Sequence, residues 1–125
     1  MMKRILIVDD AATVRMYHRA ILESAGYAVE EAVNGIEALE KALTTGYDLF
    51  LVDVNMPKMD GYAFLRELRG QAELAQAPAV MISTEAELAD RTKAYVAGAN
   101  FYMLKPIRPD MLMGHVRVLL GESCQ

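Results

Sequence analysis

Residues 48–61 of the chain read Asp48-Leu49-Phe50-Leu51-Val52-Asp53-Val54-Asn55-Met56-Pro57-Lys58-Met59-Asp60-Gly61. The apolar residues before Asp53 form a short continuous run, which is typical of a strand covered on both faces of a sheet. Asp60-Gly61 then opens a segment with helical spacing, in which an apolar stripe recurs at Phe64, Leu65 and Leu68. The stretch therefore predicts a buried strand followed by a helix, with a carboxylate at the end of the strand.

The same alternation of short apolar runs and longer helical segments extends over the whole chain. Strands are expected at Arg4–Val8, Ala28–Ala32, Asp48–Val52, Ala79–Ser83 and Phe101–Leu104. The second of these contains Glu30 and Glu31, so we expect it at an edge of the sheet. Successive strand–helix units predict an α/β fold, a doubly wound five-stranded parallel sheet with five helices, because right-handed crossovers place helices on both faces.

The expected helix boundaries follow from apolar spacing and capping residues. In the first helix, Val14, Tyr17 and Ile21 are expected to form the buried face. Thr84 and Glu87 have the spacing of a capping box, which predicts that the fourth helix begins there. The remaining helices are expected over about 36–44, after Asp60-Gly61, and after Pro109 as far as Gly121.

Composition and charge limit the class of protein. The 125 residues are 54% hydrophobic and 24% charged, the balance of a globular domain, and no linker or repeat divides residues 1–125, so one domain is expected. A net charge of −4 without a clustered basic face argues against direct binding of nucleic acid, and no apolar run is long enough to span a membrane. The segment Met1–Asp10 has too short an apolar run for a signal peptide, and the lone Cys124 cannot form an internal disulfide. These features predict a cytoplasmic protein.

Polar residues follow the ends of four of the expected strands. In doubly wound sheets, ligands bind beyond the carboxyl ends of the central strands. The residues at these ends are Asp9-Asp10, Asp53, Ser83-Thr84 and Lys105-Pro106. If the first and third strands are neighbours, three carboxylates converge there, and a hard cation such as Mg²⁺ relieves their mutual repulsion. Lys105 adds a fixed positive charge to the same place.

This set of residues suits phosphoryl transfer, which needs mainly positioning and neutralisation of the phosphoryl oxygens. A carboxylate can act as the nucleophile and form an acyl phosphate, and Asp53 suits that role because it ends a central strand. Asp9 and Asp10 are better placed as metal ligands, one directly and one through water. The hydroxyl of Ser83 can hydrogen-bond a phosphoryl oxygen.

Taken in order along the chain, Asp9-Asp10, the segment 52–61, Ser83 and Lys105-Pro106 resemble the receiver domains of bacterial two-component response regulators, in particular chemotaxis regulators. The resemblance extends over essentially the whole chain and implies a flavodoxin-like strand order of 2-1-3-4-5. It also implies a function: Asp53 would accept a phosphoryl group from a sensor histidine kinase, a histidine phosphotransfer protein or acetyl phosphate. Such a domain catalyses only its own phosphorylation and dephosphorylation and is not otherwise an enzyme.

The resemblance assigns the metal and phosphoryl contacts. Asp10 and Asp53 would ligate Mg²⁺ directly, Asp9 would contribute through a water molecule, and Asn55 would contribute its backbone carbonyl. Lys105 would pair with the phosphoryl group, and its peptide bond to Pro106 would be cis.

The resemblance also assigns a switch. The hydroxyl of Ser83 would move toward the phosphoryl group, and Tyr102 would turn inward as that hydroxyl leaves its path. Asn55 and Glu85 would set the rate of acyl-phosphate hydrolysis, and this polar pair resembles that of fast-cycling receivers.

Two partner surfaces are expected on the same basis. The kinase would dock on the loop Asp9–Ala12 and on the first helix, where Arg15, Met16 and Arg19 are expected to be exposed. A downstream protein would bind the surface formed by the fourth helix, fifth strand and fifth helix, where Tyr102 reports the phosphorylation state. The protein would be a monomer or a phosphorylation-dependent dimer, with no contact to a membrane.

Two rival functions remain open from the sequence. An aspartyl-phosphate phosphohydrolase usually carries a second acid two residues after its nucleophile, but this position is Asn55. Turnover of a generic phosphate ester that is lost on Asp53→Ala would favour this rival. The other rival is an adaptor that keeps the fold without being phosphorylated, and it would be favoured if Mg²⁺ and beryllofluoride left the spectrum of the fifth strand unchanged.

Overall fold

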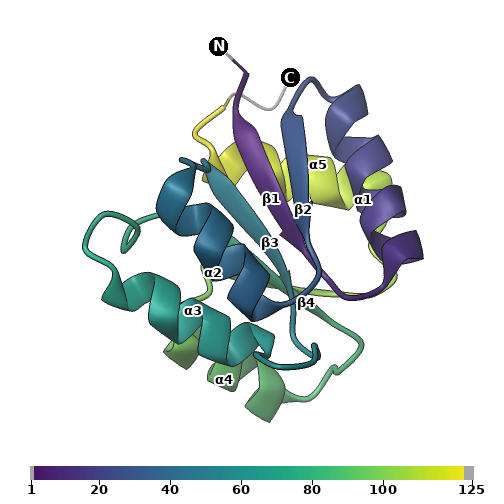
Figure 1. The fold of residues 1–125 in the computed structure, drawn as a ribbon. Helices are drawn as coiled ribbons and strands as arrows, with labels where there is room; N and C mark the ends of the chain where they lie inside the picture. Colours follow the sequence, from purple (N-terminus) through teal and green to yellow (C-terminus); the bar gives the residue numbers. More distant parts are fainter. Residues whose placement is uncertain (1, 123–125) are drawn as a thin grey trace.

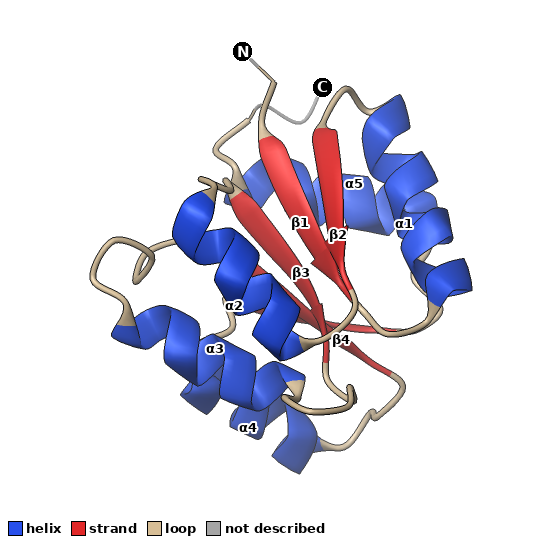
Figure 2. Cartoon of the chain, in the orientation of Figure 1, coloured by secondary structure: helices blue, strands red, loops and turns tan. Residues whose placement is uncertain are grey.

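The computed structural model describes residues 2–122 as five parallel strands and five helices (Figures 1 and 2). The strands are β1 (Arg4–Val8), β2 (Ala28–Ala32), β3 (Leu49–Asp53), β4 (Ala79–Ser83) and β5 (Phe101–Leu104). The helices are α1 (Ala12–Ser24), α2 (Gly35–Thr44), α3 (Gly61–Gly70), α4 (Leu88–Ala97) and α5 (Pro109–Leu119). None of these helices is long and apolar enough to cross a membrane. Cys124 lies outside the described residues.

The strand order is β2-β1-β3-β4-β5, and every neighbouring pair is parallel. This order confirms the predicted doubly wound, flavodoxin-like sheet. It makes β1 and β3 hydrogen-bonded neighbours in the middle of the sheet, and it places β2 at an edge, as Glu30 and Glu31 predicted.

Helices cover both faces of the sheet (Figure 1). Helices α1 and α5 lie on one face, and α2, α3 and α4 lie on the other. Successive side chains of β3 point to opposite faces of the sheet: Phe50 packs with Phe64 of α3, whereas Leu51 packs in the cluster that contains Leu112 of α5. The whole of β3 is buried because both sides of it are covered, in agreement with its continuous apolar run.

The buried face of α1 differs from the predicted one: of Val14, Tyr17 and Ile21, only Ile21 is buried, and Val14 is half-buried. His18, Ile21 and Leu22 are buried, whereas Tyr17 is 44% exposed. The Tyr17 hydroxyl donates a hydrogen bond to the carbonyl oxygen of Ile107 at 3.0 Å, so this ring lies at the rim between α1 and the segment after β5. An aromatic ring with a polar tip suits such a rim, because the tip keeps a partner there. The histidine takes the interior position that the apolar pattern had assigned to the tyrosine.

The predicted start of α4 at Thr84 is wrong. The helix begins at Leu88, and Glu87 at its N-cap makes no side-chain capping bond. Two contacts hold the preceding loop in another conformation: the Ser83 Oγ accepts from the Glu85 backbone N–H at 3.0 Å, and the Tyr102 hydroxyl donates to the Glu85 carbonyl at 2.6 Å. These bonds engage the backbone N–H and carbonyl of Glu85, so the helix starts only at Leu88, three residues after Glu85.

Gly61 allows α3 to begin directly beneath the end of β3. Its N–H donates to the carbonyl oxygen of Val54 at 2.9 Å, and a Cβ at this position would lie 2.3 Å from the carbonyl oxygen of Asp53. Since that oxygen is backbone, the substitution Gly61→Ala requires the strand end to move. We expect it to lower the free energy of unfolding by about 2–3 kcal/mol, as overpacking in a core does.

The matched control is Gly114→Ala, inside α5, where a new Cβ would meet nothing within 4 Å. Because alanine favours helix more than glycine, this variant should gain about 1 kcal/mol. Urea unfolding of both variants measures the difference. Equal stabilities for the two would contradict the steric role of Gly61.

Candidate functional site

Three carboxylates meet at the carboxyl edge of the sheet. Asp9 and Asp10 follow β1, and Asp53 is the last residue of β3. Because β1 and β3 are paired up to Val8 and Val52, their ends lie side by side. One carboxylate oxygen from each of the three acids lies within 4.8 Å of the others. Asp9 and Asp53 are only 2% and 7% exposed, whereas Asp10 lies at the open side of the pocket.

Lys105, the residue after β5, bridges the two buried acids. Its Nζ donates to Asp9 Oδ2 at 3.0 Å and to Asp53 Oδ1 at 2.9 Å. Its backbone N–H donates to the carbonyl oxygen of Ser83 at 2.8 Å, which ties the chain after β5 to the end of β4. The Lys105–Pro106 peptide bond is cis. The ammonium group therefore lies between the acids of β1 and β3.

The charges of this pocket depend on one another. Burial raises the pKa of Asp53, the hydrogen bond from Lys105 lowers it, and the negative charge of Asp9 raises it again, with a net result above the ordinary value. Burial lowers the pKa of Lys105, but the hydrogen bonds to Asp53 and Asp9 outweigh burial and raise it. The pocket thus holds a firmly protonated lysine beside an aspartate that loses its proton less readily than usual.

This raised pKa of Asp53 predicts the direction of an acid titration. In the presence of EDTA, carboxyl-carbon NMR should place the Asp53 titration above the ordinary aspartate value of about 3.9. Since the folded-state pKa is the higher one, the protonated carboxyl favours the folded state, and that contribution is lost as the pH rises through the Asp53 pKa. A midpoint at or below about 3.9 would contradict the balance of burial and charge described above.

The carboxylates fit a divalent metal ion. Oxygen ligands from carboxylates are those that Mg²⁺ prefers, and three such oxygens lie close together here. The Asp9 carboxylate is already bonded to the Ala11 N–H at 2.9 Å and to Lys105. Within residues 2–122, no hydrogen bond or ion pair engages the carboxylate of Asp10, so that group is free to bind a cation.

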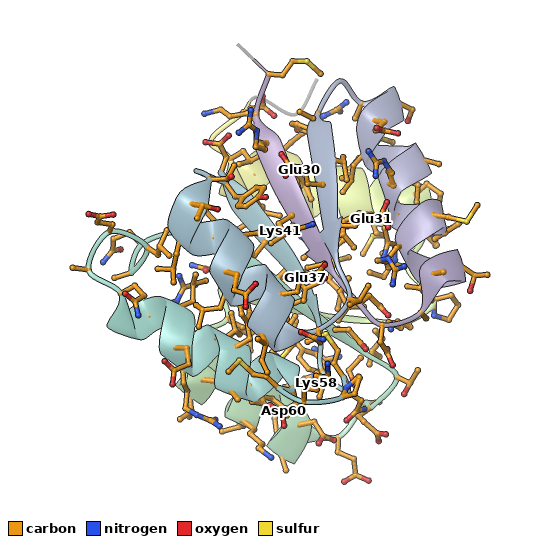
Figure 3. All side chains as sticks on the ribbon, viewed as in Figure 1. Glu30, Glu31, Glu37, Lys41, Lys58 and Asp60 are labelled. Carbon is orange, nitrogen blue, oxygen red and sulfur yellow. The ribbon has the colours of Figure 1, made fainter. Side chains whose placement is uncertain are left out.

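The loop between β3 and α3 forms another side of the pocket. Asn55 is exposed two residues after Asp53. The following turn is tight: the Met59 N–H donates to the carbonyl oxygen of Pro57 at 2.7 Å, and Lys58 has a φ of +68°, a left-handed conformation that most side chains disfavour. Figure 3 shows Lys58 and Asp60 on this loop. Asp60 caps α3 by accepting from the Ala63 N–H at 2.8 Å.

Ser83, Glu85 and Tyr102 are joined by the two hydrogen bonds of the β4–α4 loop described above. Ser83 is buried at the end of β4, and the Tyr102 ring is buried beneath the loop, with the guanidinium of Arg91 at 5.4 Å from the ring centroid. A shift of the Ser83 hydroxyl would therefore release the Glu85 N–H. The backbone of Glu85 thus connects Ser83 to Tyr102, through its N–H on one side and its carbonyl oxygen on the other.

The expectation that Arg15 is exposed is wrong. Its side chain is 14% exposed, and its guanidinium contacts Glu31 of β2 and the backbone of Asp9. Arg19 also pairs with Glu31 and is only partly exposed, whereas Met16 is 67% exposed as expected. The signal available in the sequence was an acidic edge strand following a helix that carries arginines four residues apart.

A model of the response regulator receiver domain matches residues 5–117. The chain therefore belongs to the response regulator receiver domains of two-component signalling systems, and the resemblance noted in the sequence is confirmed. Receiver domains are signalling domains that interact with histidine kinases and with downstream effectors.

Three similar proteins illustrate the range of the family. The transcriptional regulatory protein ResD of Bacillus subtilis is 38% identical over 122 residues, which are 98% of this chain and 50% of ResD. Chemotaxis protein CheY1 of Helicobacter pylori is 36% identical, with 96% of this chain and 98% of CheY1 covered. The receiver domain of the sensor histidine kinase PA1611 from Pseudomonas aeruginosa, solved with a magnesium ion in its active site cleft, is 31% identical, with a TM-score of 0.91 and coverage of 98% and 100%. The chain spans half or less of several curated relatives, ResD among them.

Proposed function

We propose that residues 1–125 form one receiver domain that accepts a phosphoryl group on Asp53. The donor would be the phosphohistidine of a sensor histidine kinase or of a phosphotransfer protein, or a small donor such as acetyl phosphate. The observation that carries the proposal is the Lys105 Nζ, held at 2.9 Å from Asp53 and 3.0 Å from Asp9 beside the free carboxylate of Asp10. This arrangement offers a nucleophile and positive charge in one pocket.

The residues would share the work as follows. A carboxylate oxygen of Asp53 attacks the phosphorus, the bond to the leaving group breaks, and an acyl phosphate forms. Lys105 neutralises a phosphoryl oxygen while it remains anchored on Asp9. Asp10, Asp53 and the backbone carbonyl of Asn55 would hold Mg²⁺, with Asp9 acting through water. When bound, the metal ion supplies the second positive charge that the phosphoryl oxygens require.

The phosphoryl group would then change the loop after β4. The Ser83 hydroxyl would turn toward a phosphoryl oxygen and release the Glu85 N–H that it now accepts from. Since the Tyr102 hydroxyl is bonded to the carbonyl of that same Glu85, the change would alter the surface of α4, β5 and α5. Asn55 and Glu85, beside the pocket, would set the lifetime of the acyl phosphate.

The partner surfaces follow from exposure. The output face carries exposed apolar side chains, Tyr95 on α4 and Met111 and Val118 on α5, which suit a downstream protein or a phosphorylation-dependent dimer contact. The kinase would dock on the β1–α1 loop and on α1, where Met16 is exposed. A cleft of about 330 Å³, lined on the helix side by Thr13, Val14 and Tyr17, opens between α1 and the segment after β5. We further propose that the domain acts in the cytoplasm without binding nucleic acid or membrane itself.

Intact mass spectrometry tests the proposed function. After incubation with acetyl phosphate and Mg²⁺, the protein should gain the mass of one phosphoryl group, and the same incubation with EDTA should give no adduct. Samples quenched in acid at short times guard against loss by hydrolysis. An adduct that forms equally well in EDTA would contradict the role of the carboxylates as a metal site.

A further inference from the structure

Arg15 on α1 connects the edge strand β2 to the turn that carries the two acids. Its Nε donates to Glu31 Oε1 at 2.7 Å, and its Nη1 donates to the carbonyl oxygen of Asp9, also at 2.7 Å. Glu31 lies on the side of β2 that faces α1 (Figure 3). One planar guanidinium therefore spans a side chain of β2 and the peptide group between Asp9 and Asp10.

The hydrogen bond from Arg15 leaves no polar group of Asp9 without a partner. Its backbone N–H donates to the carbonyl oxygen of Ala32 at 3.1 Å, and its two carboxylate oxygens accept from the Ala11 N–H and from Lys105. Arg15 engages the remaining polar group, the carbonyl oxygen. All the hydrogen-bonding groups of Asp9 are thus held, and the direction of the following residue, Asp10, is set by a fixed peptide plane.

We propose that Arg15, anchored by Glu31, is a positioning residue that presents the Asp10 carboxylate to the divalent cation. The inference rests on the proposed function, because it assigns Asp10 as a metal ligand. The Arg15 side chain does not itself contact the cation. Outer contacts that orient a metal ligand commonly change metal affinity by ten- to a hundredfold when they are removed.

Glu31, the anchor of Arg15, is paired with two arginines. Glu31 Oε1 accepts from Arg15, and its Oε2 accepts from Arg19 at 2.5 Å. Burial raises the pKa of Glu31, but the hydrogen bonds from Arg19 and Arg15 outweigh burial and hold it below the ordinary value. Glu31 is therefore ionised at neutral pH and holds the guanidinium of Arg15 in place.

Position and charge make opposite predictions for Arg15→Met. Removing a positive charge from the neighbourhood of three carboxylates should tighten Mg²⁺ binding if charge alone matters. Releasing the Asp9 carbonyl should weaken binding if Arg15 acts by positioning. The sign of the change therefore separates the two roles.

The experiment is a Mg²⁺ titration without any phosphoryl donor, followed by the backbone amide NMR signal of Ala11, well below the unfolding temperature. We expect Arg15→Met to weaken Mg²⁺ binding about tenfold. The matched control is Arg19→Met, which removes the same charge from the same helix and the same partner, Glu31, but has no contact with Asp9. This control should bind Mg²⁺ as the unmodified protein does, or slightly more tightly.

Arg15→Lys provides a second variant, which keeps the charge and the packing of the stem. A single ammonium cannot reproduce the planar fork, so we expect an intermediate loss of affinity. Unchanged or tighter Mg²⁺ binding by both Arg15 variants would overturn the positioning role alone. An unmodified protein that binds no Mg²⁺ would overturn the proposed metal site together with it.

Discussion

The substitution Asp53→Asn should abolish phosphorylation by acetyl phosphate and Mg²⁺, with no phosphoryl adduct at times when the unmodified protein is fully modified. The amide has nearly the same shape as the carboxylate, but its oxygen is neutral and does not form an acyl phosphate. The neighbouring acids do not replace it. Both oxygens of Asp9 are held by Ala11 and Lys105, and Asp10 lies at the open side of the pocket, away from the lysine contacts.

Asp60→Asn is the matched control for this loss. Asp60 lies in the loop after Asp53 and caps α3 through the Ala63 N–H, and an asparagine oxygen can accept the same bond. This variant should be phosphorylated at the normal rate. An undiminished adduct on Asp53→Asn would place the phosphoryl group on another residue and contradict the proposed nucleophile.

The same samples distinguish the rival functions. A phosphohydrolase would turn over a generic phosphate ester many times, whereas a receiver forms at most one adduct per chain. A phosphorylation-independent adaptor would form no adduct and would show no change at Tyr102 when Mg²⁺ and beryllofluoride are added. Since the Tyr102 hydroxyl is bonded to Glu85, its NMR signals should report any rearrangement of the β4–α4 loop.

The sequence predicted the sheet well because burial of the central strands leaves little choice. A run such as 49–52 has no polar face to turn to water, so it belongs between two layers of helices. The ends of such strands are then fixed in space by the parallel order, which is why Asp9, Asp53 and Lys105 could be expected together. The strand boundaries differ by one residue at most, since Asp53 itself is the last residue of β3.

Local patterns were less informative where a tertiary contact replaced them. The capping-box spacing of Thr84 and Glu87 is a local signal. Two hydrogen bonds of the Glu85 backbone displace it: the N–H donates to Ser83 Oγ, and the carbonyl oxygen accepts from the Tyr102 hydroxyl. On α1 the apolar spacing favoured Tyr17 over His18 as a buried residue. The hydroxyl of Tyr17 instead bonds a carbonyl at the rim. Tyr102 lies 17 residues from Glu85, and Ile107 lies 90 residues from Tyr17, so no short window could have contained these two contacts.

The second large effect concerns Lys105, the cation between the acids. We expect Lys105→Met to lower the free energy of unfolding by about 3 kcal/mol at neutral pH in EDTA, because removing one partner leaves two buried carboxylates without their cation. Phosphorylation by acetyl phosphate should also slow by about a hundredfold, the usual cost of losing one charge-stabilising donor. Urea unfolding and the rate of adduct formation measure the two effects.

Mg²⁺ should restore part of the stability of Lys105→Met, since a divalent cation can neutralise the same carboxylates, but it should not restore the rate. Stability and rate therefore separate the two positive charges of the pocket: either charge relieves the repulsion between Asp9 and Asp53, whereas phosphoryl transfer requires both. Lys58→Met, which removes an exposed lysine from the loop after β3, is the matched control and should change neither quantity appreciably. Full activity of Lys105→Met in saturating Mg²⁺ would contradict this division, because the metal ion alone would then supply all the charge that the transfer needs.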